Sequence, residues 1–143
     1  MKIASRFLIT ILASIFSMNM VIAAERETPQ FLEGTVRVNA EEIIGLVEEF
    51  DNLVIIDSRK KSDLTKGYIE GSVSLPNTET SPASLAKHIP SKSTPIVFYC
   101  NGTKCGRSMK AAKIAVADGY NKIYWFRGGM EEWEAKGLPV VVP

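Results

Sequence analysis

The chain has 143 residues, of which 45% are hydrophobic and 23% charged, and its formal net charge is +1. This length suits one domain and is too short for two domains with separate cores. The composition is typical of a globular protein, and no block of basic residues indicates binding to nucleic acid. Two cysteines and one histidine are too few for a structural zinc site, which normally takes four ligands.

The N-terminus has the pattern of a signal peptide over residues 1–24. Lys2 and Arg6 form its positive region, residues 7–22 are mainly apolar, and residues 23–24 are the small pair Ala-Ala. The apolar run is shorter than the roughly 20 residues that span a bilayer, which favours cleavage over an uncleaved anchor. We therefore expect a periplasmic or otherwise exported protein without a stable membrane anchor. The mature chain would carry 15 basic and 16 acidic side chains.

Residues 25–34 are polar and contain Pro29, which predicts a flexible lead-in to a domain over 35–143. Within that domain, short apolar runs alternate with stretches of helical periodicity. This alternation predicts an α/β fold with an open, mostly parallel sheet. Strands are expected at 35–38, 53–56, 73–75, 95–99 and 122–126, and helices at 40–50, 83–89, 107–118 and 130–136.

The fourth expected strand ends at Cys100, where a loop leads into the helix that begins at Arg107. Ligands of open α/β sheets bind beyond the carboxyl ends of the strands. The helix N-terminus, Lys104 and Arg107 are expected to favour the Cys100 thiolate. Gly102 and Gly106 allow the loop to curl with its N–H groups inward, as an anion nest. Such a thiolate suits attack on an anionic sulfur donor or on a phosphate or arsenate ester; the alternative is a buried cysteine that merely ends a strand.

Five segments match the motifs of one known family in order and spacing, and the sequence resembles the rhodanese family across nearly all of the mature chain. They are Asp57-Ser58-Arg59 (Asp-x-Arg), Gly67 to Pro76 (Gly-His-Ile-x-Gly-Ala-x-x-Leu-Pro), Val97 to Cys100, Gly119-Tyr120 through Gly128-Gly129, and Trp133 through Val140.

The resemblance implies a sulfurtransferase on an open, mostly parallel sheet flanked by helices on both faces. Cys100 would take a sulfane sulfur from a small anionic donor such as thiosulfate and form a persulfide. An acceptor thiol or cyanide would then remove the sulfur, without a metal or organic cofactor. Asp57 and Arg59 would brace the active loop. The donor-binding residues would be Asn101, Gly102, Thr103, Lys104, Gly106 and Arg107.

The loop departs from the family pattern in length, because six residues, 101–106, separate Cys100 from Arg107. The family's sulfurtransferases usually have four residues there, and its phosphatase and arsenate reductase branch has five. Neither substrate class therefore transfers directly from the resemblance. Tyr68 also stands where the family often has histidine.

Cys105 lies inside the same loop, and four residues separate it from Cys100. It is a candidate resolving thiol that attacks a persulfide or sulfenic acid on Cys100. The other readings are a static disulfide partner and a bystander. The sequence thus leaves two alternatives to the sulfurtransferase: a thiol–disulfide redox protein that uses both cysteines, and a non-catalytic binding module of the rhodanese fold with an unknown protein partner.

Overall fold

The computed structural model describes residues 26–143, so the expected signal peptide lies outside the described residues. Within the described part, no helix is long and apolar enough to cross a membrane. The predicted α/β architecture is confirmed: within residues 26–143, five strands form a single sheet in which every neighbouring pair is parallel. The strands are β1 (Val36–Arg37), β2 (Val54–Asp57), β3 (Val73–Ser74), β4 (Ile96–Tyr99) and β5 (Ile123–Phe126).

The sheet has the strand order β1-β5-β4-β2-β3, which places β4 at its centre. All four residues of β4 are buried, as expected for an apolar strand that is covered on both faces. At the carboxyl edge, Asp57 of β2 pairs with Tyr99 of β4, which in turn pairs with Phe126 of β5. The loops that follow these three strands therefore begin side by side.

Residues 26–143 also form four α-helices and one short 3-10 helix, of which all but the last helix connect strands. Asn39 and Ser81 are the N-caps of the helices that follow them, and each forms a capping box with the residue three positions later. The 3-10 helix was not expected from the sequence. The helices are α1 (Ala40–Glu49), η1 (Lys61–Lys66), α2 (Pro82–His88), α3 (Arg107–Ala117) and α4 (Gly129–Ala135).

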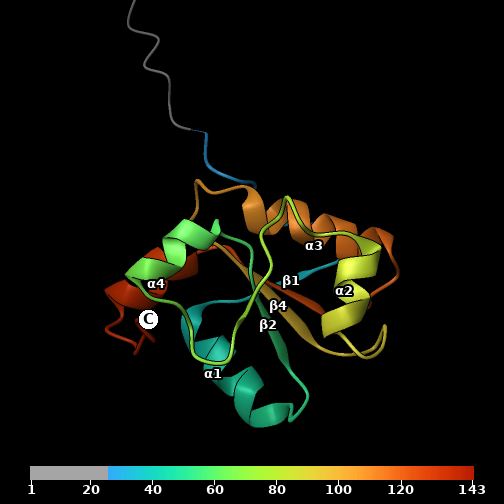
Figure 1. The fold of residues 1–143 in the computed structure, drawn as a ribbon, viewed down its shortest axis with the longest axis horizontal. Helices are drawn as coiled ribbons and strands as arrows, with labels where there is room; N and C mark the ends of the chain where they lie inside the picture. The colour runs from blue at the N-terminus through green and yellow to red at the C-terminus, as the bar shows by residue number, and fades with distance from the viewer. Residues whose placement is uncertain (1–25) are drawn as a thin grey trace, which may run out of the picture.

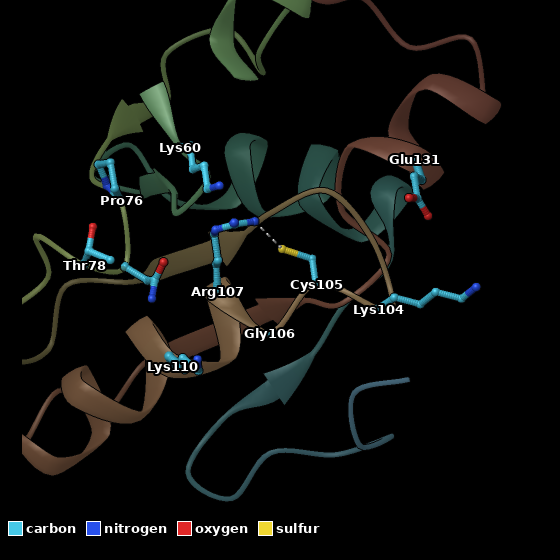
Figure 2. Close-up of a pocket in the computed structure, with 10 residues that line it drawn as sticks. Lys60, Pro76, Thr78, Lys104, Cys105, Gly106, Arg107, Lys110 and Glu131 are labelled. Carbon is cyan, nitrogen blue, oxygen red and sulfur yellow. Dashed lines mark hydrogen bonds between the residues drawn. The ribbon is translucent and has the colours of Figure 1, made fainter. Parts of the chain in front are cut away.

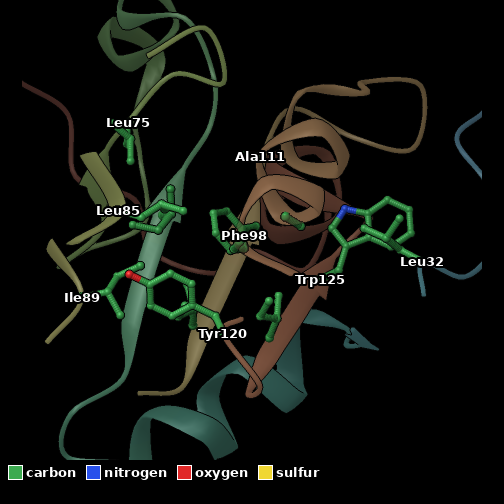
Figure 3. Packing of buried hydrophobic residues seen from close by; sticks show 13 residues of the cluster. Leu32, Leu75, Leu85, Ile89, Phe98, Ala111, Tyr120 and Trp125 are labelled. Carbon is green, nitrogen blue, oxygen red and sulfur yellow. The ribbon is translucent and has the colours of Figure 1, made fainter. Parts of the chain in front are cut away.

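The helices cover both faces of the sheet, with α2 and α3 on one face and α1 and α4 on the other (Figure 1). Side chains alternate along each strand, so Phe98 and Trp125 point into the first layer while Val97 and Phe126 point into the second. Figure 3 shows the first layer, in which the Trp125 ring lies against Leu32.

Leu32 lies within the expected flexible lead-in, and the structure differs from that expectation. Residues 26–34 are held against the domain by Arg127, whose side chain is only 4% exposed. Its Nε donates to Thr28 Oγ1 at 3.1 Å and to the Pro29 carbonyl at 2.9 Å, and its Nη2 donates to the Thr28 carbonyl at 2.7 Å. Nη2 also pairs with Glu27 at 3.1 Å. The polar composition of this segment therefore reflects hydrogen bonding to a buried arginine.

Candidate active site

The loop that follows β4 is held at its start by the first turn of α4. The N–H groups of Met130 and Glu131 donate to the carbonyls of Cys100 and Asn101 at 2.9 and 2.8 Å. Gly129 makes this approach possible: its φ is +55°, and an added Cβ would lie 2.2 Å from the Cys100 carbonyl oxygen. The Gly128-Gly129 pair therefore lets a helix end dock directly on the loop.

The N-terminal segment holds the middle of the same loop. Thr28 donates to the Thr103 carbonyl twice, from its backbone N at 2.8 Å and from Oγ1 at 2.6 Å. Arg127, which follows β5 directly, donates in turn to Thr28. Thr28 therefore connects the loop to the carboxyl end of β5.

A buried ion pair lies beneath the start of the loop. Asp57 and Arg59 are 1% and 3% exposed, and Arg59 contacts both carboxylate oxygens of Asp57, with Nη2 to Oδ2 at 2.7 Å. The Tyr99 hydroxyl donates to the same Oδ2 at 2.8 Å. Burial, with the Asp57 carboxylate beside it, raises the pKa of Tyr99, which stays a donor at neutral pH. The expected Asp57–Arg59 pair is thus present, and it is hydrogen-bonded to Tyr99, the residue just before Cys100.

The loop curls around Cys105. A turn closes between the Cys105 N–H and the Gly102 carbonyl at 3.0 Å. Arg107 Nη1 donates to the Cys105 sulfur at 3.7 Å (Figure 2). Main-chain hydrogen bonding by Arg107 and Asn101 contributes to the lowered pKa of Cys105. A hydrogen bond from the Cys100 thiol, together with these donors, lowers the pKa of Cys105 to about 5. The anion nest expected from the sequence therefore surrounds Cys105.

Cys100 lies at the expected place, beyond β4 and beside the start of α3, but it is only 1% exposed. Its thiol donates to the Cys105 carbonyl at 3.0 Å and lies 3.2 Å from Ser108 Oγ, which accepts a hydrogen bond from Trp125 Nε1 at 3.0 Å. The hydrogen bond to Cys105 and burial raise the pKa of Cys100. Arg107 thus contacts the sulfur of Cys105, and the activation of Cys100 expected from the sequence stays a prediction.

A pocket of about 660 Å³ opens above Cys105. Lysine and arginine side chains from three segments surround it, with one carboxylate, Glu131, at its edge (Figure 2). Because the charge around the opening is mainly positive, the pocket suits a small anion. Its lining comprises Lys60, Pro76, Asn77, Thr78, Lys104, Cys105, Gly106, Arg107, Lys110 and Glu131.

Three of the six predicted donor-binding residues, Lys104, Gly106 and Arg107, line this pocket, and the other three support the loop. Asn101 directs its side-chain amide to Asp63 Oδ2 at 3.4 Å. Gly102 is buried, and an added Cβ there would meet the Glu131 carboxylate. Thr103 offers its carbonyl to the N-terminal segment.

Sequence reasoning did not find the contribution of Lys60, Asn77 and Lys110 to the pocket. Lys110 stands one helical turn after Arg107, a spacing that could have marked it. Lys60 and Asn77 carry no comparable signal, because they come close only through the strand order. Tyr68, at the family's histidine position, forms an antiparallel bridge with Val141 outside the pocket. Within residues 26–143 no group of three or more metal-ligating side chains is present.

Comparison with known proteins identifies the family. The model of the rhodanese-like domain matches residues 39–136, more than half of the chain, so the chain belongs to the rhodanese-like family. It is 26% identical over 106 residues to a sulfurtransferase of Allochromatium vinosum, a match that covers 74% of this chain and 94% of that protein.

Solved structures share the fold. The BH2092 protein of Bacillus halodurans aligns with a TM-score of 0.66 at 21% identity, over 76% of this chain and 77% of that one. The polysulfide-sulfur transferase homodimer of Wolinella succinogenes aligns with a TM-score of 0.63 at 24% identity, over 77% and 80%. The expected family and fold class are confirmed, and the chain is a rhodanese-like domain with sulfurtransferase relatives.

Proposed function

We propose that this protein is a sulfurtransferase or sulfane-sulfur carrier that holds the transferred sulfur as a persulfide on Cys105. The sequence alone favoured Cys100 for this role. The observation that carries the revised assignment is the position of Cys105: its sulfur lines the cationic pocket, whereas Cys100 is closed to solvent. An external donor can reach Cys105 without any rearrangement of the loop.

With thiosulfate as the donor, the Cys105 thiolate attacks the outer, sulfane sulfur. The bond between the two sulfur atoms of thiosulfate breaks, sulfite leaves with the electron pair, and Cys105 carries the persulfide anion. The negative charge of thiosulfate and of the departing sulfite lies in the pocket lined by Lys60, Arg107 and Lys110. The Arg107 guanidinium contacts the Cys105 sulfur. An acceptor thiolate or cyanide then attacks the outer persulfide sulfur and restores the Cys105 thiolate.

The low pKa of Cys105 supports this chemistry, because the thiolate is the nucleophilic form and, after transfer, the group that leaves. The main-chain hydrogen bonding that helps to lower this pKa would also stabilise the persulfide anion. No metal or organic cofactor takes part in either step as we propose it.

Intact-mass analysis after thiosulfate treatment tests the proposal, alongside the turnover of thiosulfate and cyanide to thiocyanate. We expect reduced protein to gain one sulfur atom and Cys105→Ala to gain none. Lys110→Met should raise KM for thiosulfate about fivefold, whereas Lys113→Met, on the same helix outside the pocket, should not. Full turnover by Cys105→Ala would overturn the assignment to Cys105.

We also propose that the protein is exported and acts after removal of residues 1–24, on the strength of the signal-peptide pattern. Cell fractionation with N-terminal sequencing tests this proposal. The expected mature protein begins just after Ala23 or Ala24, and a cytoplasmic protein that retains residues 1–24 would contradict it.

A further inference from the structure

The buried thiol of Cys100 has no place in the sulfur transfer described above. It is 1% exposed, so neither donor nor acceptor reaches it from the pocket. Its contacts nevertheless point to one reactive group: the thiol donates to the Cys105 carbonyl at 3.0 Å, and the Cys105 side chain is the first cause of the raised pKa of Cys100. A buried second thiol therefore neighbours the residue whose sulfur faces the pocket.

The loop brings the two cysteines together by its own fold. The turn from Gly102 to Cys105 directs the chain back toward Cys100, and α4 holds the Cys100 carbonyl in place from the other side. A disulfide requires Cβ atoms about 4 Å apart, and Cys100 Sγ already contacts the main chain of Cys105. The short contact between Cys100 Sγ and the Cys105 carbonyl places the two residues side by side within the loop.

Hydrogen-bonding groups of Ser108 beside the Cys100 sulfur are placed to stabilise a thiolate there. Trp125 Nε1 donates to Ser108 Oγ at 3.0 Å, and this oxygen lies 3.2 Å from Cys100 Sγ, where its hydroxyl is able to donate to a thiolate. The Ser108 main-chain N–H, in the first turn of α3, also points at the Cys100 sulfur. These two donors would hold a thiolate that forms at Cys100 when its proton leaves.

Building on the proposed function, we propose that Cys100 is a resolving thiol that releases the sulfur held on Cys105 as hydrosulfide. Cys100 Sγ attacks Cys105 Sγ, the inner sulfur of the persulfide. The bond between Cys105 Sγ and the outer sulfur breaks, and the outer sulfur leaves with the electron pair and takes the proton of the Cys100 thiol. The products are HS⁻ and a disulfide between Cys100 and Cys105.

In this step the outer sulfur is reduced to sulfide while the two cysteines are oxidised. The cycle closes when an external dithiol reduces the disulfide, by thiol–disulfide exchange that starts at Cys105, the half-exposed member of the pair. The protein then has two outcomes for one persulfide: transfer to an acceptor in the pocket, or release as sulfide at the expense of a dithiol. Burial of Cys100 confines the second outcome to sulfur already bound on Cys105.

A single-turnover experiment on the purified, fully reduced protein tests this step. One equivalent of thiosulfate or of glutathione persulfide is added without cyanide or reductant, and sulfide and intact mass are followed in time. We expect one sulfide per protein and a final mass two hydrogens below the reduced protein. Trypsin cleaves after Lys104, so its products should contain two peptides joined through Cys100 and Cys105.

The Cys100→Ala variant should keep the sulfur that it takes up and release no sulfide. Ser108→Ala should release sulfide about tenfold more slowly, because its hydroxyl no longer stabilises the attacking thiolate, whereas Ser93→Ala, an exposed serine, should match wild type. The tryptic map of wild-type protein tests for the Cys100–Cys105 disulfide without any variant, so a variant that fails to fold does not affect this test.

Two results separate the resolving step from the proposed function. Wild-type protein that takes up sulfur and keeps it as a persulfide, with no sulfide and no linked peptides, would overturn the resolving role alone. Protein that takes up sulfur from neither donor would overturn the proposed function and this step with it. A persulfide mapped to Cys100 would overturn the division of roles between the two thiols.

Discussion

The pH at which Cys105 loses its reactivity should lie near 5, and a small aromatic disulfide such as dithiodipyridine can measure it. An ordinary thiol of pKa 8.5 is about 3% ionised at pH 7, whereas Cys105 is almost fully ionised, a gain of about thirtyfold in thiolate. Nucleophilicity falls with pKa, however, by roughly fortyfold over the same interval. The two effects nearly cancel, so a rate measured at pH 7 does not reveal the lowered pKa.

The difference appears in acid. At about pH 5.5 an ordinary thiol is roughly 0.1% ionised and Cys105 about three quarters, so Cys105 should react about twentyfold faster after the correction for nucleophilicity. The fast phase of the reaction with dithiodipyridine, which we assign to Cys105, should therefore persist in wild-type protein down to a midpoint near pH 5. The Cys105→Ala variant should lose that phase. Cys100→Ala should raise the midpoint, because the Cys100 thiol provides the largest contribution to the lowered pKa. A wild-type midpoint near 8.5 would refute the assignment of the nest to Cys105.

Three further predictions concern the supports of the loop. Asp57→Asn leaves a buried arginine without its counter-ion and should lower the free energy of unfolding in urea by about 3–5 kcal/mol; a loss below about 1 kcal/mol would contradict this. Gly129→Ala should cost at least about 2 kcal/mol, since its Cβ meets the Cys100 carbonyl. Gly137→Ala, at φ +66° with open space around it, should cost only about 1 kcal/mol in the same assay, and equal losses would argue against the clash. Thr28→Val removes two hydrogen bonds beside the loop and should speed amide exchange at residues 101–105, with α2 unchanged; unaltered loop exchange would show that the N-terminal segment does not restrain it.

Much of the fold was predictable because its signals are local. The apolar run that becomes β4 is buried on both faces, and the caps at Asn39 and Ser81 occupy the positions that their residue types favour. The role of Arg127 was not predictable. Its partners Thr28 and Pro29 lie almost one hundred residues away, and a polar segment that binds a buried arginine has the composition of a flexible one.

The sequence by itself determined that a cysteine-bearing loop with glycines and cations stands at the carboxyl edge of a parallel sheet. That conclusion needs only the order of strands and helices along the chain. Tertiary structure decided which cysteine faces the pocket. The first turn of α4 donates to the loop at Cys100 and Asn101, and Thr28 donates to it at Thr103, so segments far away in the sequence hold its curl. Sequence spacing cannot reveal which of two sulfurs a curled loop encloses and which it exposes, because distant segments set the curl.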